Sequence, residues 1–144
     1  MTIGFVVDSS VSVGWVVPAQ SSAATESLLD LVQAGSRIYV TALWPFEVAN
    51  SLLQLVRRKR IDWNDYEDGL QAIRRLGPVI DEEGPHSALG ETSRLARRYD
   101  LTVYDASYLE LATRRRLPLA SRDLALIAAA KKCGLALIGV GLRG

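Results

Sequence analysis

Short, continuously apolar runs alternate with longer stretches in which apolar residues recur at helical spacing, and this alternation constrains the fold more than any other feature of the chain. The predicted strands are, in chain order, "IGFVVD" (3–8), "RIYVTA" (37–42), "PVIDEE" (78–83, as an edge strand), "LPLAS" (117–121) and "ALIGV" (136–140). Strands that are apolar on both faces and linked through helices are typical of a parallel sheet covered on both sides. We therefore predict an α/β fold, with three α/β/α layers and a central, mainly parallel sheet of four to five strands.

The helical patterns are bounded by ordinary start and stop signals. Pro45 suits a first helical turn, Gly35 suits a helix end, and the basic run "RRKR" at 57–60 complements the dipole at a carboxyl end. Residues 9–17, by contrast, are predicted to form a loop after the first strand. The predicted helices span residues 21–34, 43–60, 63–76, 86–99, 104–116 and 122–133.

Length and composition favour one folded domain over residues 1–144. The 144 residues are 49% apolar, and neither a repeat nor a low-complexity linker interrupts them. The apolar opening lacks a basic leader, carries Asp8 in its middle and is too short to span a bilayer. Cys133 is the only cysteine, which is consistent with a reducing compartment. We expect a cytoplasmic protein without membrane association.

Four acidic residues stand where predicted strands end or the following helices begin. Asp8 closes the first strand, Glu47 lies in the first turn after the second, Asp105 opens a helix, and Asp123 follows "LPLAS". Ligands of such sheets bind beyond the carboxyl ends of the strands, so all four acids can face one ligand site. The acids of the polar segments, such as 62–68 and 82–83, are typical of a solvated surface.

Taken singly, each acid also has a structural interpretation. Asp105 and Asp123 could cap helices, Glu47 could be a dipole-favoured first-turn acid, and Asp8 could be a turn residue. Asp105, however, interrupts an apolar run from Leu101 to Ala112 that is otherwise typical of a core. Four converging carboxylates would repel each other and require a cation, and oxygen ligands suit Mg²⁺ or Mn²⁺. A zinc site is not indicated, because the chain has one His and one Cys.

The strings "FVVDSSVSVGWVV", "LWPFEVANSLL", "LTVYDASYLELA" and "LPLASRDLAL" resemble, in order and spacing, the motifs of PIN-domain ribonucleases. The likeness extends over essentially the whole chain and is greatest to VapC-like toxins of prokaryotic toxin–antitoxin pairs. It implies that the four acids form the metal-binding and catalytic set. It also implies supporting hydroxyls from Ser10 and Ser121, and a structural role for Asn50 near the first acid. The metal-binding set that the resemblance implies consists of Asp8, Glu47, Asp105 and Asp123.

The same resemblance implies an activity and partners. We expect an endoribonuclease that hydrolyses RNA phosphodiester bonds with Mg²⁺ or Mn²⁺, forms a homodimer and is neutralised by a VapB-like antitoxin. An exposed apolar groove for the antitoxin is expected along the helices at 44–60 and 63–76.

Other functions and surface roles stay open at this point. A Mg²⁺-dependent phosphatase would place a second carboxylate where this chain has Ser10, and a receiver domain would end a late strand in lysine; an idle interaction module would keep only the fold. The basic blocks at 57–60 and 114–116 suit RNA contact or a solvated helix end equally well. Trp15 and Trp44 could stack on bases, but we favour packing for both.

Overall fold

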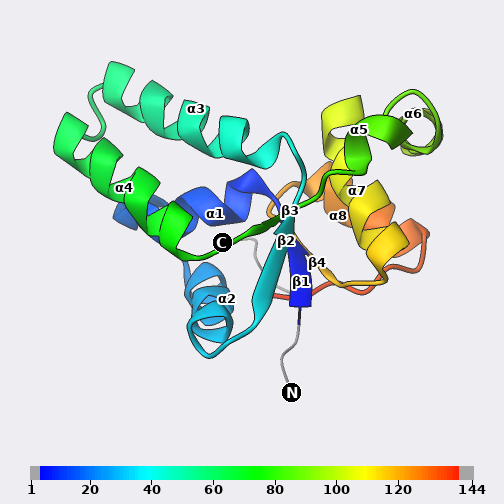
Figure 1. Ribbon diagram of the computed structural model, residues 1–144, viewed down its shortest axis with the longest axis horizontal. Coiled ribbons are helices and arrows are strands. Elements are labelled where there is room, and N and C mark those ends of the chain that lie inside the picture. Colours follow the sequence, from blue (N-terminus) through cyan, green and yellow to red (C-terminus); the bar gives the residue numbers. More distant parts are fainter. Residues whose placement is uncertain (1–3, 140–144) are drawn as a thin grey trace.

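A four-stranded parallel sheet forms the centre of the computed structural model, which describes residues 4–139 (Figure 1). Its strands are β1 (Gly4–Val7), β2 (Arg37–Val40), β3 (Val79–Ile80) and β4 (Leu119–Ala120). The order β3-β2-β1-β4 makes β3 an edge strand, as predicted, and every pairing is parallel. The predicted last strand is reduced to a single parallel bridge between Leu119 and Leu137, and residue 140 lies outside the described residues.

Helices cover both faces of this sheet, which confirms the three-layer α/β/α prediction. Figure 1 shows α1 to α4 on one side of the sheet and α5 to α8 on the other. In residues 4–139, none of the helices has the length and apolar character needed to cross a membrane. The helices are α1 (Ser9–Val16), the 3₁₀ helix η1 (Pro18–Gln20), α2 (Ala23–Gln33), α3 (Trp44–Arg57), α4 (Trp63–Arg75), α5 (Gly84–Ser87), α6 (Glu91–Tyr99), α7 (Val103–Arg115) and α8 (Leu124–Lys132).

The prediction of a loop over residues 9–17 is wrong, because Ser9–Val16 forms α1, which η1 then follows. The carboxylate of Asp8 caps α1 by accepting a hydrogen bond from the Val11 backbone N–H. The middle of the helix is buried from Val11 to Gly14 and packs against α2 and α3. A short helix buried around its middle shows no amphipathic period, and its valines favour strands when considered alone.

The predicted helix at 86–99 is also wrong in its extent, since α5 and α6 are separate helices. Gly90 stands between them with a non-helical backbone (φ −125°, ψ −107°) as the N-cap of α6. Leu89, just before it, is 97% exposed, so the apolar residue that extended the helical pattern contributes nothing to the core.

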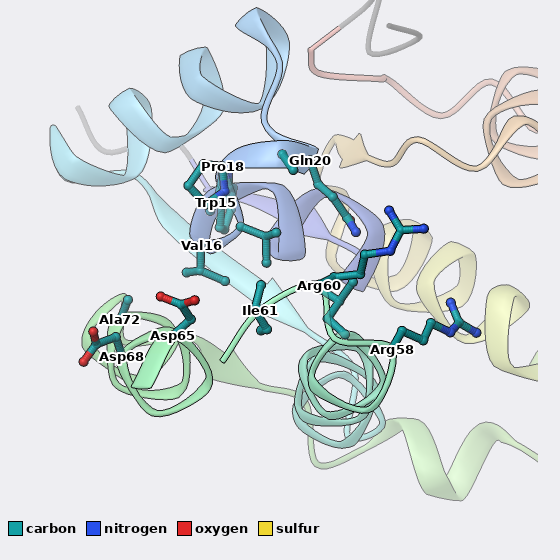
Figure 2. Close-up of a pocket in the computed structure, with 14 residues that line it drawn as sticks. Trp15, Val16, Pro18, Gln20, Arg58, Arg60, Ile61, Asp65, Asp68 and Ala72 are labelled. Atoms are coloured by element: carbon teal, nitrogen blue, oxygen red, sulfur yellow. The ribbon is translucent and has the colours of Figure 1, made fainter. Parts of the chain in front are cut away.

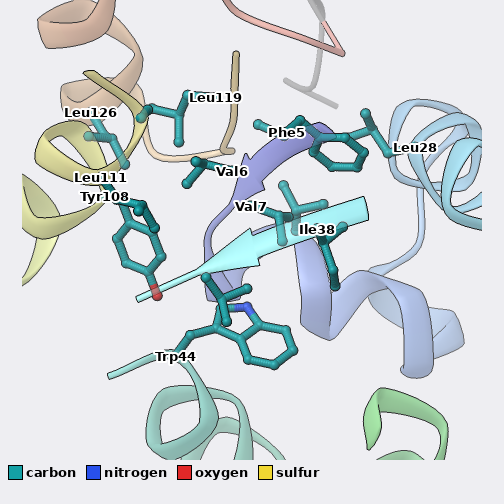
Figure 3. Close-up of a cluster of buried hydrophobic side chains, with 14 of the residues drawn as sticks. Phe5, Val6, Val7, Leu28, Ile38, Trp44, Tyr108, Leu111, Leu119 and Leu126 are labelled. Carbon is teal, nitrogen blue, oxygen red and sulfur yellow. The ribbon is translucent and has the colours of Figure 1, made fainter. Parts of the chain in front are cut away.

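The core fills the space on both faces of β1, as Figure 3 shows. Phe5, Val6 and Val7 are fully buried, which explains why this strand has no polar face. Around them pack Leu28 of α2, Ile38 of β2, Trp44 of α3, Tyr108 and Leu111 of α7, Leu119 of β4 and Leu126 of α8. The core therefore fixes the end of β1, which carries Asp8, and the starts of α3, α7 and α8, which carry Glu47, Asp105 and Asp123.

Candidate active site at the carboxyl ends of the strands

Asp8 lies at the junction of β1 and β4, where parallel pairing of Val7 with Ala120 brings Ser121 beside it. Its side chain is buried and accepts hydrogen bonds at both oxygens. Ser10 Oγ donates to Oδ1 at 2.6 Å, and Ser121 Oγ donates to Oδ2. The two serines expected to support the site therefore both contact its most buried acid.

Asp123 lies two residues beyond Ser121 and begins α8. Its backbone N–H donates to Ser121 Oγ at 3.0 Å, and its carboxylate accepts from the Leu126 backbone N–H at 3.1 Å. The capping interpretation of Asp123 is therefore confirmed. Burial raises the pKa of Asp8 to about 6, and the negative charge of Asp123 contributes to the rise.

Asp105 occupies the first turn of α7 and is half-buried. Its capping interpretation is wrong, because the cap of α7 is Thr102, whose Oγ1 accepts from the Asp105 backbone N–H at 3.0 Å. Burial raises the pKa of Asp105, and the charge of Asp123 raises it further. The neighbouring Val103 and Tyr104 are exposed and Leu101 is only partly buried, so full burial within the run at 101–112 begins at Ala106, after Asp105.

Glu47 lies in the first turn of α3 and accepts a hydrogen bond from the Tyr108 hydroxyl. Burial raises the pKa of Tyr108, as do the hydrogen bond and charge of Glu47 and, more weakly, the charge of Asp8. The Tyr108 hydroxyl thus contacts Glu47 directly and lies within range of the charge of Asp8. Sequence reasoning missed Tyr108 because it looks like a core aromatic, although it follows Asp105 by three residues and so shares its helix face.

Asn50 and the tryptophans have simpler surroundings. Asn50 is exposed, one turn after Glu47, and makes no side-chain hydrogen bond within residues 4–139. It borders a cavity of about 560 Å³ together with Ser10 and Arg122. Trp44 is buried and donates to Ser12 Oγ at 2.9 Å, which confirms its packing role, while Trp15 is half-buried and donates to the Thr25 carbonyl.

None of the four candidate acids forms an ion pair in the described part of the chain. The ion pairs found there involve Arg94 with Glu91 and Arg114 with three other acids, Asp81, Glu83 and Glu110. Arg114, from the basic block at 114–116, is thus occupied by internal contacts. Within residues 4–139, none of the four candidate acids has a basic group at ion-pair distance, although the charge of Asp8 acts on the Arg122 guanidinium.

The donor set fits a hard divalent cation in its chemistry, because it consists of carboxylate and hydroxyl oxygens. Asp8 and Asp105 both experience the charge of Asp123, and this mutual repulsion is what a cation would relieve. In residues 4–139, however, no three Asp, Glu, His or Cys side chains are grouped so that they could hold a metal ion as they stand. The structure thus brings Asp8 and Asp105 within range of the charge of Asp123, but in the described residues the four carboxylates are not gathered on one spot as the sequence led us to expect.

Comparison with known proteins places the fold in context. The PIN domain family matches residues 5–132 of the chain. The chain is 32% identical over 120 residues to ribonuclease VapC9 of Mycobacterium tuberculosis, covering 77% of this chain and 88% of the relative. Ribonuclease VapC3 of Pyrobaculum aerophilum is 27% identical over 107 residues, covering 74% of this chain and 79% of that protein. The crystal structure of PAE2754 from P. aerophilum superposes with a TM-score of 0.70 at 25% identity, covering 90% of this chain and 87% of that one.

Proposed function

Because the chain belongs to the PIN-domain family, among its VapC-like members, we propose that it is a divalent-metal-dependent endoribonuclease and the toxin of a toxin–antitoxin pair. The observation that carries the proposal is electrostatic. The charge of Asp123 acts on both Asp8 and Asp105, and no base in the described residues pairs with any of the three. The phosphatase and receiver alternatives lose their basis, since the family match is to PIN domains.

Asp8, Glu47, Asp105 and Asp123 would hold the Mg²⁺ or Mn²⁺. A bound ion of this kind lowers the pKa of water and offsets the charge that develops on the phosphate. Ser10 and Ser121 fix the two oxygens of Asp8, which orients this carboxylate before any ligand arrives. Tyr108 fixes one oxygen of Glu47 and leaves the other to orient the attacking water.

We further propose that a VapB-like antitoxin binds the groove shown in Figure 2. This groove of about 1000 Å³ lies between α1 and η1 on one side and the α3–α4 region on the other. Asp65 and Asp68 stand at one end and Arg58 and Arg60 at the other, with Ile61 between them. An antitoxin segment with apolar side chains and charges of both signs would suit this lining.

Two expectations about the whole protein belong to the same proposal. The toxin acts on cytoplasmic RNA, and it is a homodimer, to which the exposed apolar side chains Phe46, Leu89 and Tyr104 could contribute. Light scattering of the purified chain tests whether it is a homodimer.

The decisive experiment incubates the purified chain with a mixed RNA pool, with and without Mn²⁺ or Mg²⁺. We expect metal-dependent cutting by the parent and its loss in Asp8→Asn and Asp105→Asn. Asp62→Asn is the matched control, because Asp62 caps α4 far from the site and Asn also caps helices well. Folded Asp8→Asn and Asp105→Asn variants that cut as well as the parent would refute the assignment of the acids.

The remaining alternative gives a different result in the same assay. An idle interaction module would bind an antitoxin but leave RNA intact at every metal concentration. Release of phosphate from a monoester substrate without RNA cutting would instead indicate a phosphatase.

A further inference from the structure

Arg122, which sequence reasoning did not select, packs its guanidinium against α1 at Gly14. The backbone of Arg122 donates to Ser10 Oγ at 3.1 Å, and its Nη2 donates to the Gln20 carbonyl at 2.6 Å. The guanidinium crosses α1 at Gly14, where an added Cβ would lie only 2.1 Å from Nη2. Any residue larger than glycine at position 14 would therefore displace the guanidinium.

The Arg122 guanidinium has N–H donors without an acceptor in the described part of the chain. Nη1 has no acceptor within residues 4–139 and is the donor left for an outside anion, while Nε also lacks a partner but is buried. No carboxylate in this part of the chain forms an ion pair with it. A cation held in place with unused donors is arranged to bind an anion.

The cavity that Arg122 borders adjoins the Asp8 site at Ser10. Ser10, which donates to Asp8, lines one part of it, and Arg58 at the end of α3 lines another. Most of the other lining residues are polar, namely Ser9 and Ser10 of α1, Gln20 of η1, and Asn50, Ser51 and Gln54 of α3; Val13 and Leu55 are the apolar ones. Hydroxyl and amide groups with two arginines suit a sugar–phosphate backbone better than an apolar protein segment.

We propose that Arg122 binds an RNA phosphate next to the scissile bond, and that the single strand continues between α1 and α3 toward Arg58. This inference rests on the proposed ribonuclease function and adds the path of its substrate. Gly14 contributes by leaving space for the guanidinium. An acidic segment of a protein partner is the competing occupant.

The test measures binding of a fluorescent single-stranded oligoribonucleotide in EDTA, so that no cleavage occurs, over a series of salt concentrations. Arg122→Gln should weaken binding by about 5- to 10-fold near 0.1 M salt and lower the slope of log K against log salt by about 0.7. Arg97→Gln is the matched control, because Arg97 is an exposed arginine of α6 and the change in charge is identical. This control should bind like the parent.

Gly14→Ala tests whether the position of the Arg122 guanidinium matters, because it displaces this group without changing any charge. It should weaken RNA binding as Arg122→Gln does, and the double variant should be no weaker than either single one. Far-ultraviolet circular dichroism checks that each variant is folded; if Gly14→Ala fails to fold, the salt slope of Arg122→Gln decides alone.

Two outcomes overturn the inference. Arg122→Gln could lower the melting temperature while leaving RNA affinity and salt slope unchanged, which would make Arg122 only a clamp on the Gln20 carbonyl. Alternatively, it could weaken binding of an oligo-aspartate peptide but not of RNA, which would assign the site to a protein partner. Cleavage assays distinguish a failure of this inference from a failure of the proposed function. If RNA is cut and cutting needs the acids, but Arg122→Gln leaves the salt slope of RNA binding unchanged, only the proposed RNA path is refuted. If RNA binding depends on Arg122 but no RNA is cut, only the ribonuclease function is refuted.

Discussion

At the scale of single residues, Asp8 combines deep burial with a full set of hydrogen bonds. Two serine hydroxyls and a backbone N–H donate to it, and each lowers its pKa, yet burial outweighs them and brings the pKa to about 6. A carboxylate in this position is stable in its charged form only at a cost in folding free energy. A bound cation would remove much of that cost.

The pH dependence of stability should reveal this cost in the metal-free protein. The rise in the pKa of Asp8 from 3.8 to about 6 means that the folded state holds its proton longer than the unfolded state does. The free energy of unfolding should therefore fall as pH rises from about 4 to 6, by roughly 3 kcal/mol at most. Urea denaturation in EDTA at a series of pH values measures this, with Asp8→Asn as the variant in which this contribution is absent. Parallel pH profiles for parent and variant would contradict the prediction.

Tyr108 should influence catalysis through Glu47. Removing its hydroxyl in Tyr108→Phe leaves one Glu47 oxygen without its donor, so we expect kcat to fall by about 10-fold with KM little changed. Unfolding should become easier by about 1 kcal/mol, the usual value for one hydrogen bond. Tyr104→Phe is the control, because this tyrosine lies on the same helix with its side chain exposed. Equal kinetics for the two variants would show that the phenol does not orient Glu47.

At the scale of elements, the contact between α7 and the β3–α5 segment depends on buried charges. Arg114 of α7 donates to Asp81 at 2.7 Å and 3.0 Å and to Glu110 at 2.8 Å. Both acids are buried, and although burial alone would raise the pKa of Asp81, the Arg114 guanidinium holds it below its usual value. This cluster fixes the helix that carries Asp105 and Tyr108.

Arg114→Met should therefore be among the most destabilising single changes in the chain. It would leave two buried carboxylates without their counter-ion, which typically costs about 3–5 kcal/mol. Arg115→Met is the control, since Arg115 lies over the Tyr39 ring at the surface and should contribute about 1 kcal/mol or less. Urea midpoints of the two variants measure the difference in stability. Similar losses of stability would show that the Arg114 cluster contributes no more than the exposed Arg115.

The elements also show which signals in the sequence were sufficient. Apolar runs bounded by turn residues predicted all four strands of the sheet, and helical periodicity predicted α2, α3, α4, α7 and α8 to within a few residues. It failed for α1, because that helix is buried around its middle, and at Gly90, because Leu89 continued the pattern outside the core. Strand ends predicted the neighbourhood of Asp8 and Asp123, but Tyr108 and Arg122 depend on tertiary contacts that no local pattern records.

At the scale of the whole molecule, the four acids belong to segments that are distant in sequence. Asp8 follows β1, Glu47 lies on α3, Asp105 on α7 and Asp123 at the start of α8. Any ligand shared by them joins both helical layers across the end of the sheet. Metal binding should therefore stabilise the entire fold rather than one loop.

Thermal unfolding with added Mn²⁺ should show this linkage. An ion that binds only the folded state adds about 2.7 kcal/mol at 100 times its Kd, which corresponds to a rise in Tm on the order of 5–10 °C for a chain of this size. Asp105→Asn and Asp123→Asn should each reduce the rise, because each removes one negative charge from the group, whereas the helix-capping control Asp62→Asn should keep it. Scanning calorimetry at fixed pH, with EDTA as the reference, gives all four values. A rise in Tm that is equal in all variants would place the Mn²⁺ elsewhere on the surface and separate these acids from metal binding.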